Sequence, residues 1–108
     1  MSTMRIIKSF PEDLSRRDAY KLTESQTTRK LVELAGSIIE PEKWVLFEDE
    51  DKTVLTLEAD GELYGTISGT FIDAFIKAFD NLGADMGPIR IVTGTSRAGR
   101  TYVTCELA

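Results

Sequence analysis

The order of β-type and helix-type segments constrains the fold of this chain more than any other feature of its sequence. Residues 44–47 and 52–57 are β-rich runs on either side of a short acidic tip, which is typical of a hairpin. The Asp60-Gly61 dipeptide that follows is a strong turn signal, so residues 62–67 are expected to form a third strand. Three consecutive strands are therefore predicted in the middle of the chain.

An amphipathic helix is predicted directly after these three strands. Apolar residues recur at helical spacing through residues 71–79 and form one face. Thr70 and Asp73 stand in an arrangement similar to a capping box, and Gly83 marks the expected end of the helix. This phenylalanine-rich face is expected to be part of the core.

A second hairpin, formed by residues 89–96 and 100–107, closes the chain in this interpretation. Composition alone leaves other small α+β folds open, but a helix between the third and fourth of five strands favours the OB-fold. We therefore expect a mainly β protein, with a single OB-fold-like five-stranded barrel in residues 30–108. Residues 1–29 are expected to form an N-terminal extension that contains a short helix at residues 11–20.

The residue pattern leaves three local alternatives open. Residues 3–10 fit either a short strand or an arm, and residues 29–34 fit either a strand or a helical turn. A strict two-residue turn at Asp60-Gly61 would place Tyr64 opposite Leu57, facing inward. A bulge or a longer loop would turn Tyr64 outward.

The residue types that this 108-residue chain lacks exclude several functions. It has no histidine, which rules out Ser-His-Asp and Cys-His catalysis and zinc sites built from cysteine and histidine. Its single cysteine, Cys105, is expected to be a small core residue in a reducing environment. No run approaches the ~20 apolar residues of a membrane span, and residues 1–5 lack the apolar region of a signal peptide. We expect a cytoplasmic protein with no catalytic activity, cofactor, metal or membrane partner.

Charge is distributed unevenly along the chain, whose net charge is −5. Residues 1–30 carry seven basic and four acidic residues, and residues 88–108 carry three basic residues and one acidic residue. The segment between them carries three basic and thirteen acidic residues. A folded chain with two basic ends can still present one positive face to a nucleic acid.

The last hairpin collects residues that suit a nucleic-acid partner. A two-residue loop at Ala98-Gly99 would set Arg97 opposite Arg100 and Thr95 opposite Tyr102. One face would then carry arginines, threonines and a tyrosine, which can hold phosphates and stack a base. The other face would suit the core, with Val92, Gly94, Val103 and Cys105.

A second candidate for base stacking comes from the hairpin in the middle of the chain. A two-residue loop at Glu50-Asp51 pairs Trp44 with Leu57 on the face expected to be buried. Phe47 then points the other way. A large aromatic side chain on an outer face is a candidate platform for a base.

Three short motifs stand in a fixed order: ADGELY at residues 59–64, IS at 67–68 and VTGTS at 92–96. Together with residues 20–23 and 36–40, they resemble the single-stranded DNA-binding proteins of small protein-primed phages and related proteins in prophages of Gram-positive bacteria. The similarity runs from about Tyr20 to Leu107. Its weight comes from the order and spacing of the motifs.

This resemblance implies an OB-fold protein that coats replication intermediates, protects them from nucleases and assists strand-displacement synthesis. The aromatic positions used for DNA contact in such proteins fall on Phe47 and Tyr64, with phenylalanine replacing a tyrosine at Phe47. The tip at residues 48–51 is shorter and more acidic than in the phage proteins, which argues against a DNA contact there. Residues 1–19 align poorly and carry no implied role.

The residues and the resemblance together support sequence-independent binding of single-stranded DNA by a phage-type replication protein. Stacking and phosphate contacts would make the affinity dependent on salt. The basic segment 16–30 is a candidate for contact with DNA or with a neighbouring copy, and replication proteins are further candidate partners. The alternative is a phage-encoded or prophage-encoded interaction module that docks on a protein through its acidic middle. The expected stacking residues are Tyr64, Phe47 and Tyr102, and the expected phosphate contacts are Arg97, Arg100, Arg90 and Lys43.

Overall fold

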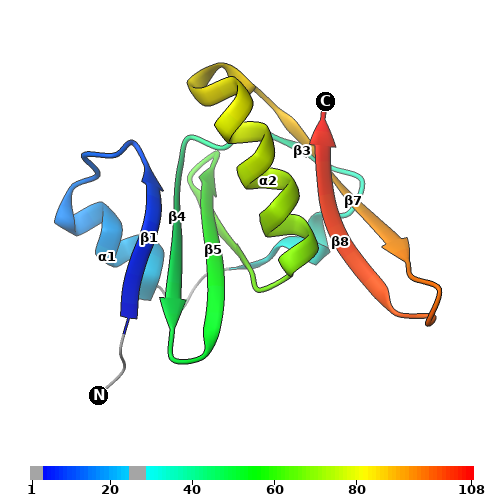
Figure 1. Ribbon diagram of the computed structural model, residues 1–108. Helices are drawn as coiled ribbons and strands as arrows, with labels where there is room; N and C mark the ends of the chain where they lie inside the picture. The colour runs from blue at the N-terminus through cyan, green and yellow to red at the C-terminus, as the bar shows by residue number, and fades with distance from the viewer. Residues whose placement is uncertain (1–3, 25–28) are drawn as a thin grey trace.

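The computed structural model describes residues 4–24 and 29–108 and places their strands in two sheets (Figure 1). The larger sheet has the strand order β1-β4-β5-β6-β2, and the smaller sheet has the order β3-β7-β8. In these two ranges, no helix has both the length and the apolar character that a membrane crossing requires. The elements are β1 (Met4–Phe10), α1 (Arg16–Glu24), β2 (Arg29–Lys30), the short 3-10 helix η1 (Leu31–Leu34), β3 (Ile38–Ile39), β4 (Lys43–Asp49), β5 (Lys52–Ala59), β6 (Glu62–Thr66), α2 (Gly69–Leu82), the short 3-10 helix η2 (Gly83–Met86), β7 (Ile89–Thr95) and β8 (Thr101–Leu107).

The two tight turns of the larger sheet form as their residues predict. β4 and β5 pair from Asp49 and Lys52 outward, so the loop between them has two residues. Asp60 and Gly61 both have positive φ, at 53° and 77°, as a type I′ hairpin turn requires. The predicted three-stranded antiparallel unit is thereby confirmed.

Helix α2 forms where the amphipathic pattern predicts it, but a different residue caps it. The hydroxyl of Ser68 accepts a hydrogen bond from the Phe71 amide, 3.3 Å away, so the helix begins at Gly69. The expected cap at Thr70 is therefore wrong by two residues. Gly83 ends the helix with a φ of 61°, a left-handed conformation that glycine adopts without strain.

The main core lies between α2 and the two sheets, and Figure 1 shows the helix running between β5 and β8. Trp44 of β4 meets the rings of Phe75 and Phe79 edge to face, with centroids 5.4 and 4.9 Å apart. Phe71 and Phe75 are fully buried. The predicted aromatic face of the helix is confirmed as core.

The N-terminal residues build onto the larger sheet. β1 pairs with β4 at the edge of that sheet, which resolves the choice between strand and arm. α1 begins at Arg16, later than residues 11–20 predict, because the Ser15 hydroxyl accepts a hydrogen bond from the Asp18 amide and caps the helix there. This helix covers the sheet face opposite α2 and buries Leu22 against Val45.

From β4 to β8 the order of strands and helix agrees with the prediction, but the strands do not close into a barrel. Residues 29–34 form both a strand, β2, and a 3-10 turn, η1, so each of the two alternatives describes part of this segment. β2 pairs in parallel with β6 and occupies the edge that closure would need. In the part of the chain that the structure describes, β8 pairs with β7 alone. The protein is therefore mainly β with two sheets, and an opening separates β6 and β8.

Candidate nucleic-acid interface

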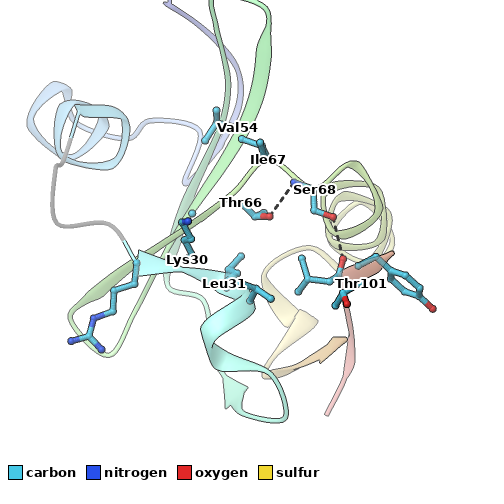
Figure 2. Close-up of a pocket in the computed structure, with 12 residues that line it drawn as sticks. Lys30, Leu31, Val54, Thr66, Ile67, Ser68 and Thr101 are labelled. Atoms are coloured by element: carbon cyan, nitrogen blue, oxygen red, sulfur yellow. Dashed lines mark hydrogen bonds between the residues drawn. The ribbon is translucent and has the colours of Figure 1, made fainter. Parts of the chain in front are cut away.

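A groove of about 650 Å³ lies at this opening between the two sheets. β2 and η1 form one wall, β8 forms the other, and the segment that connects β6 to α2 lies between them. Figure 2 shows Lys30 and Leu31 on one side, Thr101 on the other, and Val54 and Ile67 toward the larger sheet. Segments far apart in the sequence thus meet at one hollow.

The walls of the groove are mainly apolar and include three exposed large side chains. Ile67 is 64% exposed and Tyr102 is 39% exposed, and Val32 is exposed as well. Buried Leu31 and Val103 lie beside them. Apolar groups gathered in an open hollow mark a surface that can bind a partner with apolar faces.

The amide and hydroxyl of Ser68, which lines the groove, are already engaged by the fold. The Ser68 amide donates to the hydroxyl of Thr66, 3.0 Å away, and the Ser68 hydroxyl donates to the carbonyl of Val103, 3.2 Å away (Figure 2). The Ser68 hydroxyl also accepts from the Phe71 amide. These groups are therefore committed to internal hydrogen bonds and are poorly suited to read the edges of bases.

The charge of the groove is opposite to that of the chain. Its lining includes Arg29 and Lys30, and none of the described residues that line it is a carboxylate, although the net charge is −5. Glu62 lies at the periphery, with its Oε2 3.7 Å from Nε of Arg29, and both side chains are exposed. The groove is therefore a locally positive, largely apolar site.

The register of the last hairpin differs by one residue from the prediction. The Ser96 amide donates to the carbonyl of Arg100, 2.8 Å away, which leaves a three-residue loop. Gly99 has a φ of 79°, the left-handed conformation that such a loop needs, and Tyr102 faces Gly94 across the strands. The expected pairing of Tyr102 with Thr95 is therefore wrong.

This register changes which residues share a face. Tyr102 lies on the same face as Arg100 and Arg90, and on the opposite face from Thr93 and Thr95. Val103 and Cys105 face the core, as expected. Val92 and Gly94, which were expected on the core face, instead lie on the face of Tyr102.

Two of the three expected stacking residues are buried. Phe47 points away from Trp44, as predicted, but α1 covers that face of the sheet and leaves the ring only 4% exposed. Tyr64 lies opposite Leu57 and is 8% exposed, as the strict two-residue turn requires. The expectation that Phe47 and Tyr64 are accessible for stacking is therefore wrong, and Tyr102 alone of the three lines the groove.

The four expected phosphate contacts divide into two pairs. Arg97 and Arg100 are exposed in the loop that leads into Tyr102, and no carboxylate among the described residues lies within ion-pair distance of either. Arg90 is paired with Glu106, with Nη1 and Oε1 3.1 Å apart. Arg97 and Arg100, in the loop that precedes β8, are therefore the two expected phosphate contacts that remain without an ion-pair partner among the described residues.

Lys43 lies away from the groove and has a partner of its own. Its Nζ is 3.0 Å from Oδ2 of Asp18 on α1. The hydrogen bond between them lowers the pKa of Asp18 below its usual value and raises the pKa of Lys43, and a hydrogen bond from Ser15 also lowers the pKa of Asp18. The contact joins α1 to β4, so the expected role of Lys43 at phosphates has no support in its position.

Of the residues that line the groove, sequence reasoning identifies Tyr102 alone as a site residue; the residues that it misses include Arg29, Lys30, Val32 and Ile67. The first two belong to the basic segment 16–30, which the charge distribution singles out without indicating what these residues face. No local signal identifies Val32 and Ile67, because an apolar residue at the end of a strand or in a short turn is expected to be buried.

Comparisons with known proteins identify no relative: no family model, curated protein or solved structure matches the chain. The similarity to phage proteins therefore stays a prediction.

Proposed function

We propose that this protein binds single-stranded DNA without reading its sequence, and that the strand lies in the groove between β2-η1 and β8. The observation that carries the proposal is the combination of exposed apolar walls with two cations and no carboxylate among the described lining residues. A single strand offers the complementary chemistry, because it has apolar base faces on one side and phosphates on the other.

The apolar walls account for the lack of sequence preference. In the groove, a base can lie against Ile67 and Val32, and the next base can stack on the Tyr102 ring, which lies over Gly94 on the outer face of the β7-β8 hairpin. Every base has a π-face for such contact. Because the amide and hydroxyl of Ser68 are held in internal hydrogen bonds, Ser68 is poorly suited to distinguish one base edge from another.

The basic residues account for the attraction of the backbone. Arg29 and Lys30 lie on one wall of the groove, and Arg97 and Arg100 lie in the loop next to the other wall. Neutralised phosphates release counterions, so the affinity falls as salt rises. Duplex DNA has the same phosphates, but its base faces are already stacked, which leaves the apolar walls without a partner.

We interpret the fold as an OB-type fold whose two sheets do not join into a barrel. Strands β4 to β6, helix α2 and strands β7 and β8 follow the OB order, and the groove takes the place of the closing pair between β6 and β8. A protein of this kind, with no catalytic residues, would coat and protect single strands in the cytoplasm during phage-type replication.

The test is a titration of fluorescently labelled oligo(dT), followed by anisotropy, at about 20 mM and about 300 mM salt. A labelled strand is preferable to intrinsic fluorescence because Trp44 is fully buried. We expect binding at low salt that weakens at high salt, with a much weaker response to duplex of equal length. Equal affinity for duplex, or no binding at tens of micromolar protein, would refute the proposal.

The acidic middle of the chain favours the alternative, a protein–protein interaction module. Glu50 and Asp51 are exposed at the tip between β4 and β5, in the segment with thirteen acidic residues. Reversing the charges of Arg97 and Arg100 would abolish DNA binding but leave this alternative function intact. The two functions are therefore separable in one variant.

A further inference from the structure

Gly94 of β7 lies directly opposite Tyr102 of β8, and the tyrosine ring occupies the space above it. A Cβ atom at position 94 would lie 2.5 Å from both Cζ and Oη of Tyr102, and 3.1 Å from its Cε1. No side chain fits at position 94 while the ring keeps its place.

The backbone does not explain why position 94 is a glycine. Gly99 in the adjacent loop has a positive φ, but Gly94 does not, so its backbone conformation is open to any residue. Glycine within a strand weakens the strand, because it adds flexibility and has no side chain to pack. The space beneath the Tyr102 ring is therefore the feature of this site that requires glycine.

We propose that Gly94 is a positioning residue for DNA binding, which holds the Tyr102 ring against the sheet so that its outer face stays open to stack a base. This inference rests on the function proposed above and extends the site from the groove to the outer face of the last hairpin. Tyr102 borders the groove and is 39% exposed, and its ring reaches across to Gly94 on β7, on the opposite face from core-facing Val103.

Positioning the ring favours binding because a stacking platform must be held in one orientation. A free tyrosine on an outer face samples several rotamers and loses that freedom when a base binds. The Tyr102 ring that rests on Gly94 has already lost most of this rotamer freedom before a base binds. Arg100 lies two residues before Tyr102 on the same face, so a phosphate contact lies next to the stacking position.

The binding test is a double-mutant cycle with oligo(dT), using Gly94→Ala, Tyr102→Leu and the double variant. Loss of one stacked base predicts an affinity about 5- to 150-fold weaker for Tyr102→Leu. Gly94→Ala should also weaken binding, because its methyl group displaces the ring. In the double variant the ring is gone, so Gly94→Ala should cause no further loss.

Two controls separate positioning from a general effect on the fold. Tyr102→Phe keeps the ring and should bind like the natural protein. Gly69→Ala is a matched glycine substitution, because a Cβ at Gly69 meets no atom within 4 Å and its φ is not positive. This variant should bind unchanged.

A spectroscopic measurement tests the ring position without DNA. A ring held over Gly94 shifts the Gly94 Hα resonances upfield, and Tyr102→Leu should remove that shift. This readout stands even if Gly94→Ala fails to fold. Unshifted Gly94 resonances, or a Gly94→Ala variant that binds normally while Tyr102→Leu binds weakly, would overturn the inference and leave the proposed function intact. Failure of the natural protein to bind oligo(dT) would overturn both.

Discussion

Replacing Phe47 with alanine separates a structural role from a DNA-binding role at this position. The ring is 4% exposed and packs with Leu22, Val45 and Leu63 between α1 and the larger sheet. Truncating a buried phenylalanine to alanine costs about 3–5 kcal/mol of unfolding free energy. A domain of this kind has about 5–15 kcal/mol in total, so the variant should be close to unfolding.

The assay combines urea denaturation with oligo(dT) titration of the same samples. Phe47→Leu keeps more of the volume and should lose less stability than Phe47→Ala, so its binding can be measured on folded protein. We expect its affinity for oligo(dT) to be unchanged, because α1 keeps the ring away from any ligand. Tyr102→Leu is the matched control and should show the reverse pattern, with nearly full stability and weak binding.

One result would refute this reasoning. If Phe47→Ala unfolds at the same urea concentration as the natural protein but binds oligo(dT) several-fold more weakly, Phe47 contacts DNA directly. The packing of α1 against β4 would then be wrong, and the candidate site would move to the opposite face of the larger sheet.

Three further predictions test the groove and the core. Lys30→Gln should reduce the slope of log affinity against log salt by about 0.7, the value for one phosphate contact with a single strand, whereas Lys77→Gln on α2 should leave the slope unchanged. Ile67→Glu, which adds a carboxylate to the groove at an exposed position, should abolish oligo(dT) binding with little change in the urea midpoint, and Ile38→Glu, at another exposed position, should not affect binding. Burial raises the pKa of Cys105 to about 11, so iodoacetamide should label the native protein slowly at pH 8 and the urea-unfolded protein quickly; equal rates would place the thiol outside the core.

Some features of the fold that depend on local chemistry are described correctly by sequence reasoning. Asp60-Gly61 adopts positive φ at both residues because that dipeptide tolerates it, and the pairing of β5 with β6 follows. The same turn settles the direction of Tyr64, one of the alternatives that residue pattern leaves open. Each of these features depends on residues close together in the chain.

The register of β7 and β8 depends on which of two hairpin loops forms, and these loops differ in length by one residue. A two-residue loop at Ala98-Gly99 and a three-residue loop ending at Gly99 are both compatible with a left-handed glycine. The three-residue loop gains two hydrogen bonds: the Ser96 amide donates to the Arg100 carbonyl, and the Ser96 hydroxyl accepts from the Arg100 amide. In a β-sheet, a register shift of one residue moves side chains to the other face. Here the shift places Gly94 opposite Tyr102 and under its ring.

By itself, the sequence determined the order of the elements, the two tight turns, the core face of α2 and the inward direction of Trp44, because periodicity and turn chemistry act over a few residues. Only the tertiary structure decided what covers each face. α1 buries Phe47, and β2 occupies the edge of β6, which leaves the groove open beside β8. The physical reason is that exposure depends on contacts between segments distant in the chain, and neither alternation nor charge along the sequence specifies which distant segment will pack there.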